Sequence, residues 1–154
     1  DELFSQIVDH VATTGGRRRI ALQVDGTDEE SLAAPLAASC GEVVVVPVYR
    51  WALPHDTRPA EALVGLVCDG EVDAVTFTTR QAAVHLVDVA EAQGRRQDLV
   101  DALDGTRVVP VSVGPVCSEA MRALGMTGVV EPDRARLVAM LDALAEVART
   151  RSGS

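Results

Sequence analysis

Hydrophobic positions follow two alternating patterns along the chain. Short runs of β-branched residues predict strands at residues 20–24, 43–46, 74–77 and 108–113, with no more than a short edge strand at 129–130. Longer stretches with apolar residues at helical spacing predict helices at residues 1–12, 28–39, 60–68, 81–93, 98–103, 118–124 and 134–149. We expect Pro35 to kink or shorten the second of these helices.

Strands that alternate with helices across short turns predict an α/β fold, with parallel sheets flanked by helices. The four consecutive valines at residues 43–46 are typical of a strand covered on both faces. Ligands of such sheets bind at the carboxyl ends of the strands. This rule selects three segments as candidate sites, residues 25–27, 76–79 and 114–118.

Three threonines, Thr76, Thr78 and Thr79, lie where the strand at 74–77 gives way to a helix. Hydroxyls and the free N–H groups of a helix N-terminus together form an anion-binding site. Threonine is also a common helix N-cap, and capping alone accounts for the composition. The sequence alone does not decide between an anion-binding site and a simple helix cap.

The segment after the strand at 108–113 repeats this arrangement with Gly114, Val116, Cys117 and Ser118. A helix N-terminus favours the thiolate of a cysteine, yet no histidine is an evident partner for Cys117. We therefore interpret Cys117 as a small buried residue and not as a nucleophile.

The proline-rich connection at residues 49–59 contains Tyr49 and Trp51, the single tyrosine and the single tryptophan of the chain. Rare aromatic residues in a loop favour recognition over core packing. The alternative is that Trp51 packs on a surface and that Tyr49 has no role.

Composition narrows the classes of function. The 154 residues are 47% hydrophobic, which excludes a disordered tail, and no apolar run is long enough to span a membrane. A net charge of −9 argues against binding of nucleic acid by this segment. Lysine is absent, so Schiff-base chemistry and a P-loop lysine are excluded.

Cysteines and histidines are scattered, which predicts neither a disulfide framework nor a metal site. A reducing, cytoplasmic location is the simplest expectation. The chain begins without methionine, which suggests a fragment, and residues 149–154 have the composition of a linker or a frayed end.

Four segments in order resemble the uroporphyrinogen-III synthase family. Residues 16–22 (GRRRIAL) resemble its GxRV strand, and residues 41–49 (GEVVVVPVY) resemble its G-x-x-V…VY segment. Residues 72–79 (VDAVTFTT) resemble D-x-V-x-F-T-S, and residues 113–125 resemble xGPxTAxAxxxLG. Two departures are Arg80 in place of a common proline and Cys117 in place of a threonine.

The resemblance implies flavodoxin-like α/β lobes joined by a linker. Residues 1–48 then belong to one lobe, 49–57 to the linker, 58–150 to a second lobe and 151–154 to a tail. The alternative is a single α/β domain over residues 1–150. The match is to the later part of the family's chain, in a composition similar to actinobacterial members, so a segment before residue 1 is expected.

The resemblance also implies an activity: closure of hydroxymethylbilane, a linear tetrapyrrole, to uroporphyrinogen III without metal or cofactor. Tyr49 matches the family tyrosine proposed to assist departure of the hydroxyl group. The implied substrate-binding residues are Thr76, Thr78, Thr79, Gly114, Val116, Cys117 and Ser118. A second hypothesis is a sensor domain fused to a C-terminal winged-helix DNA-binding domain, and a third is an α/β domain for an unrelated ligand.

Overall fold

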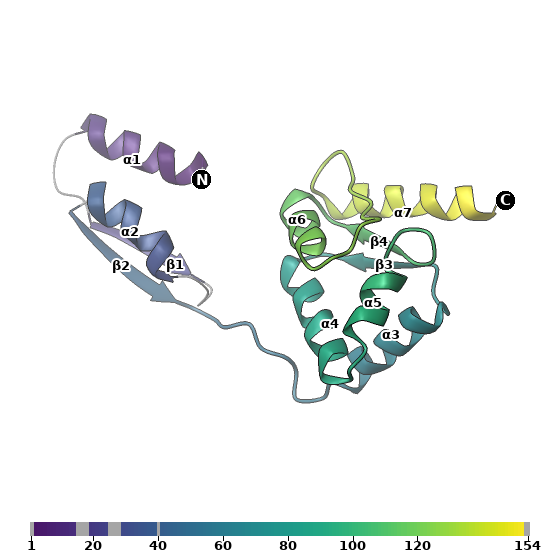
Figure 1. Cartoon of the computed structure of the whole chain (residues 1–154). Helices are drawn as coiled ribbons and strands as arrows, with labels where there is room; N and C mark the ends of the chain where they lie inside the picture. Colours follow the sequence, from purple (N-terminus) through teal and green to yellow (C-terminus); the bar gives the residue numbers. More distant parts are fainter. Residues whose placement is uncertain (1, 15–18, 25–28, 40, 153–154) are drawn as a thin grey trace. The chain divides into compact units, whose positions relative to one another are not determined.

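A computed structural model describes residues 2–14, 19–24, 29–39 and 41–152, so the turn predicted at 25–27 lies outside the described residues. The chain forms two compact units, Asp1–Ala52 and Leu53–Ser154 (Figure 1). Among the described strands, β1 pairs with β2 and β3 pairs with β4, each pair within one unit.

The first unit has the element order α1 (Glu2–Thr14), β1 (Arg19–Val24), α2 (Glu29–Ser39) and β2 (Glu42–Pro47). β1 and β2 are parallel, with Ile20 opposite Val43 and Val24 opposite Pro47. Pro35 lies inside α2, which nevertheless runs to Ser39. Of the two expected effects of Pro35, the shortening is therefore wrong, and the kink stays a prediction.

The valine run of β2 alternates in burial. Val43 and Val45 are half-buried, whereas Val44 and Val46 are 42% and 40% exposed. The prediction that this strand is covered on both faces is wrong for the described residues. The physical reason is that helix packing, here by α2 against β2, buries one set of alternate side chains and leaves the other open.

The second unit contains α3 (Arg58–Asp69), β3 (Ala74–Phe77), α4 (Arg80–Ala92), α5 (Arg96–Ala102), β4 (Val109–Ser112), α6 (Pro115–Ala123) and α7 (Leu137–Ser152). β3 and β4 are parallel, with Ala74 opposite Val109 and Phe77 opposite Ser112. The short edge strand expected at 129–130 is an isolated parallel bridge between Val130 and Val111.

Two of the helices that begin earlier than predicted, α3 and α6, have proline in the first turn. α3 starts at Arg58, directly before Pro59, and α6 starts at Pro115. Proline is tolerated there because a first-turn N–H has no helical acceptor, and its fixed φ suits the helix. Pro59 therefore lies in the first turn of α3 instead of in the connection before it, and Pro115 is the first residue of α6.

α7 begins at Leu137, after residue 134, and continues to Ser152, so the interpretation of residues 149–152 as a frayed end is wrong. The guanidinium of Arg151 explains the difference. It donates to four backbone carbonyls, those of Asp73 (3.4 Å), Gly105 (3.0 Å), Thr106 (2.6 Å) and Arg107 (3.1 Å). These bonds fix the end of α7 to the turns that precede β3 and β4.

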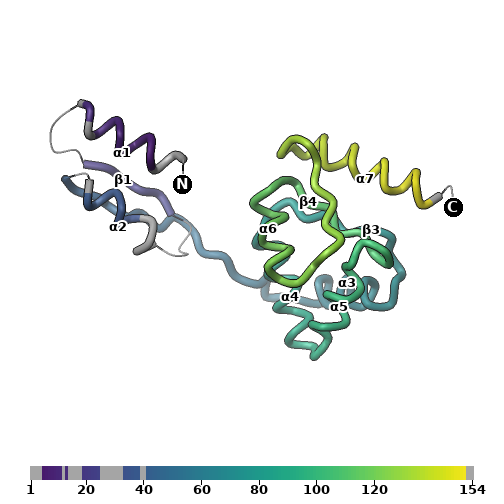
Figure 2. Tube along the Cα trace, turned by 45° about the horizontal axis from the view of Figure 1, so that its top comes forward, coloured from purple at the N-terminus to yellow at the C-terminus, as the bar shows by residue number. Residues whose placement is uncertain are grey.

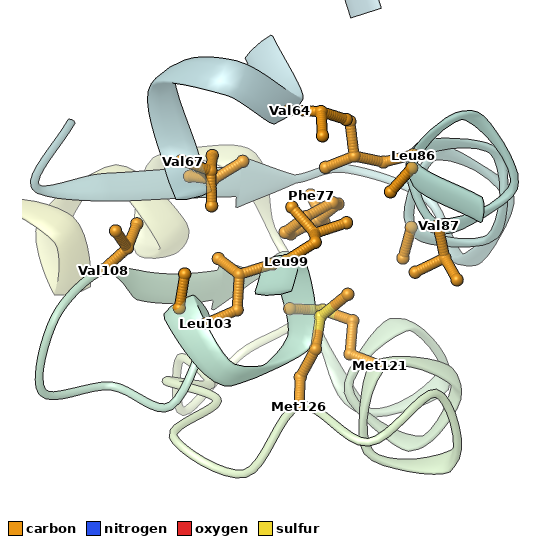
Figure 3. Close-up of a cluster of buried hydrophobic side chains, with 14 of the residues drawn as sticks. Val64, Val67, Phe77, Leu86, Val87, Leu99, Leu103, Val108, Met121 and Met126 are labelled. Carbon is orange, nitrogen blue, oxygen red and sulfur yellow. The ribbon is translucent and has the colours of Figure 1, made fainter. Parts of the chain in front are cut away.

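The main core of the second unit lies between one face of the β3–β4 pair and helices α3 to α6, while α7 covers the other face (Figures 1 and 2). Phe77 lies in the middle of this core, among Leu86, Leu99 and Met121 (Figure 3). All four β4 residues are buried, as the hydrophobic run at 108–113 predicted. Because β3 and β4 contribute buried residues to the core, their carboxyl ends, which carry the candidate site, are held in fixed positions.

Candidate functional site

The carboxyl ends of β3 and β4 lie side by side, because the two strands are parallel and in register. The Val113 N–H donates to the Phe77 carbonyl at 3.0 Å, directly beyond the last paired residues. α4 and α6 start just after these ends, at Arg80 and Pro115. The structure thus brings together two of the predicted segments, residues 76–79 and 114–118.

The three threonines of β3 and α4 have different environments. Thr79 is the N-cap of α4, and its hydroxyl oxygen accepts the Ala82 N–H at 3.1 Å, which confirms the capping interpretation for this residue. Thr78 is exposed beside it. Thr76 is exposed as well, because it points away from the core face that Val75 and Phe77 occupy.

The first turn of α6 is closed around the carbonyl of Gly114. The N–H groups of Cys117 and Ser118 both donate to this oxygen, at 3.1 and 3.0 Å. Pro115 has no N–H, so Val116 is the first-turn residue whose N–H is not used in this way. The Val116 side chain is 68% exposed, which leaves the helix end accessible to solvent.

The Ser118 side chain points inward from α6. It is fully buried, and its hydroxyl lies 2.5 Å from that of Ser112 and donates to the Gly114 carbonyl at 3.3 Å. The hydroxyl of Ser118 therefore anchors the turn to β4 and is not presented to a ligand.

Cys117 is 3% exposed and its thiol contacts the Phe77 carbonyl at 3.5 Å. Burial raises the pKa of the Cys117 thiol, although a backbone hydrogen bond from Val113 opposes the shift. Desolvation thus outweighs that hydrogen bond, and the thiol is neutral near pH 7. The interpretation of Cys117 as a small buried residue is confirmed.

Two residues of this site were missed from the sequence. Ser112 shares the buried hydroxyl contact with Ser118, and its signal was a polar residue inside an apolar run. Ala135 packs against Gly114 so closely that a Cβ on Gly114 would lie 2.6 Å from the Ala135 Cβ. No sequence pattern indicates this contact, because it joins residues that lie far apart in the sequence.

Charge at the helix starts differs among helices α3 to α6 of the second unit. α4 and α6 have no acidic residue in their first turns, whereas α3 and α5 have Glu61 and Asp98 there. Acidic side chains near a helix N-terminus compensate the positive end of its dipole. At α4 and α6 no acidic side chain of the first turn compensates the positive end of the dipole, so these helix starts favour the binding of an anion.

Tyr49 belongs to the first unit, in a segment after β2 that forms neither helix nor strand. Its side chain is 52% exposed, and that of Trp51 is 42% exposed. The two rings are in edge-to-face contact, with centroids 5.6 Å apart and an angle of 85° between the planes. The phenol is thus accessible to a ligand.

Other kinds of site find no support in the part of the chain that the structure describes. There, no three or more His, Cys, Asp or Glu side chains are grouped so that they could hold a metal ion. None of the described helices combines the length and the apolar character needed to cross a membrane.

Comparison with known proteins identifies relatives of this chain. The sequence model of the family "Uroporphyrinogen-III synthase HemD" matches residues 2–142. A protein of Methanothermobacter thermautotrophicus named "Putative uroporphyrinogen-III synthase" is 39% identical over 104 residues, 68% of this chain and 39% of that protein. "Uncharacterized protein YjjA" of Bacillus subtilis is 29% identical over 129 residues, 84% of this chain and 47% of that protein.

Solved structures give the same result. Two structures of Thermus thermophilus uroporphyrinogen III synthase are similar, at 26% identity with a TM-score of 0.59 and at 25% identity with a TM-score of 0.54. They cover 94% and 91% of this chain, which covers 56% and 54% of theirs. The α/β fold with short parallel sheets flanked by helices matches these structures, and the chain spans about half the length of its relatives or less. The chain belongs to the uroporphyrinogen-III synthase HemD family.

Proposed function

We propose that this protein catalyses its family's reaction, the closure of hydroxymethylbilane to uroporphyrinogen III with inversion of the last pyrrole ring. The observation that supports this most is the strand edge where α4 and α6 begin, both without an acidic residue in the first turn. The substrate is a polycarboxylate. Two uncompensated helix N-termini at one edge suit such a ligand, even in a chain of net charge −9.

Binding in this proposal uses the accessible groups of the edge. Thr76, Thr78 and Thr79 offer hydroxyl donors, and Val116 offers a backbone N–H at the start of α6. Gly114, Cys117 and Ser118 contribute through their backbone, which forms the first turn of α6 and positions the Val116 N–H. The side chains of Cys117 and Ser118 are buried and do not reach the substrate.

Catalysis in this proposal assigns the proton donor to Tyr49. Its phenol O–H protonates the hydroxyl group of the substrate. The C–O bond then breaks, and the departure of water leaves an azafulvene cation. The far pyrrole ring attacks this cation to give a spiro intermediate, which opens and recloses with the ring inverted. The ring carbon that forms the last bond loses its proton, which restores the phenol of Tyr49. The remaining task of the protein is to hold the chain of rings in the folded geometry.

Residues 49–57 are, in this proposal, the linker between two lobes, residues 1–48 and 58–150, of a protein of cytoplasmic location. Tyr49 then stands at the start of the linker. The proposal draws on the split of the chain into two compact units near residue 52.

A second candidate is a sensor domain that binds a tetrapyrrole without turnover, fused to a winged-helix domain. The observation that favours it is the inward orientation of Cys117 and Ser118. The first turn of α6 then offers the backbone N–H of Val116, which serves binding and not proton transfer.

Replacing Thr78 by glutamate tests the proposed anion site. The side chain is exposed, so folding should be unaffected, while the new carboxylate repels the substrate carboxylates at the start of α4. We expect about a tenfold rise in KM or Kd for hydroxymethylbilane, since one close unfavourable charge contact costs on the order of 1 kcal/mol. Steady-state kinetics or fluorescence titration measures it.

The matched control is Thr78→Gln, which has the same shape as Thr78→Glu but no charge. We expect its affinity to stay within about threefold of the original. Equal affinities for the two variants would remove the edge of β3 and β4 from the binding site.

A further inference from the structure

We propose that Trp51 is a positioning residue for Tyr49: its indole holds the phenol ring in the orientation from which the hydroxyl donates its proton. This inference rests on the proposed function of Tyr49. Its basis is the edge-to-face contact between the two rings, with centroids 5.6 Å apart and planes at 85°.

The local backbone explains why these two rings meet. Residues 48–52 continue from β2 without helix or strand structure, and side chains two positions apart in extended backbone lie on the same side. Arg50, between them, is exposed. Neither ring is anchored in a core, because Tyr49 is 52% and Trp51 42% exposed. The mutual contact is therefore what restricts the rotation of the phenol.

The geometry of the pair suits this task. Edge-to-face contact sets the positive edge of one ring against the negative face of the other, which is a favoured arrangement for aromatic side chains. A proton donor must be held within hydrogen-bond distance of the group that leaves, and a donor that rotates freely spends less time there. Trp51 thus acts on the reaction through Tyr49 and is not itself a proton donor.

Kinetics of Trp51→Ala provide the first test. We expect kcat to fall about two- to tenfold, with KM changed less than twofold, since a contact of this kind alters an equilibrium by about that factor. Trp51→Phe, which retains an aromatic ring, should recover most of kcat. Leu53→Ala is the matched control, an exposed apolar residue of the same segment, and should leave both constants unchanged.

The double variant Tyr49→Phe/Trp51→Ala separates positioning from any other role. If Trp51 acts through the phenol hydroxyl, the second substitution lowers kcat no further once that hydroxyl is gone. A loss that multiplies with that of Tyr49→Phe would overturn this inference and leave the role of Tyr49 intact. An unchanged kcat for Tyr49→Phe alone would instead overturn the proposed role of Tyr49, and this inference with it.

Spectroscopy tests the contact without reference to activity. The chain has one tyrosine, one tryptophan and two phenylalanines, so its near-ultraviolet circular dichroism above the phenylalanine bands comes from Tyr49 and Trp51. We expect Trp51→Ala to remove most of the tyrosine signal, because the indole no longer restricts the phenol, and Trp51→Phe to retain it, because an aromatic ring still contacts Tyr49. A tyrosine signal that persists in Trp51→Ala would contradict the inference.

Discussion

Replacing Gly128 by alanine is expected to destabilise the protein by about 3 kcal/mol, at the upper end of the cost of overpacking. A Cβ on Gly128 would collide with the carbonyl group of Asp104 and with the Cα of Gly105. All of these are backbone atoms, which cannot turn aside as a flexible side chain does. The same crossing constrains Gly105, whose own Cβ would lie 2.7 Å from the Gly128 Cα.

Gly94→Ala is the control for this prediction. Gly94 has a φ of +70°, and no neighbouring atom lies within 4 Å of the place that a methyl group would take, so alanine there has conformational strain without collision. We expect it to cost about 1 kcal/mol. Chemical denaturation measures both variants, and a Gly128→Ala variant no less stable than Gly94→Ala would contradict the close backbone crossing.

Tyr49→Phe is expected to lower kcat for hydroxymethylbilane about 100-fold, the lower end of the contribution of a positioned general acid. The substitution removes only the phenol oxygen and retains the ring that contacts Trp51. KM should change little, because in the proposed mechanism the proton is transferred in the transition state. Rapid mixing with freshly prepared substrate measures kcat.

Stability separates a chemical effect of Tyr49→Phe from a structural one. The side chain is 52% exposed, so we expect the free energy of unfolding to change by less than about 0.5 kcal/mol. Full turnover by a folded Tyr49→Phe variant would remove Tyr49 from the mechanism.

Much of the fold follows from local rules. The hydrophobic periodicity located every described strand and helix, and Thr79 at the end of β3 marked the start of α4. Two of the errors lie where distant contacts decide. Arg151 holds the end of α7 through carbonyls of the turns before β3 and β4, and the exposure of Val44 and Val46 depends on which face the helices cover.

The candidate site was predictable in its position and less so in its geometry. The rule that ligands bind at the carboxyl ends of parallel strands selected residues 76–79 and 114–118, which the structure brings together. The inward turn of Cys117 and Ser118 and the packing of Ala135 on Gly114 depend on tertiary contacts. Periodicity alone does not determine such contacts.

Analysis of the product isomer tests the central proposal most directly. Hydroxymethylbilane closes without an enzyme to uroporphyrinogen I, so inversion of the last ring reports catalysis. We predict that the full-length protein converts hydroxymethylbilane to uroporphyrinogen III. Chromatography after oxidation separates this product from the type I isomer. Formation of the type I isomer alone would contradict the proposal.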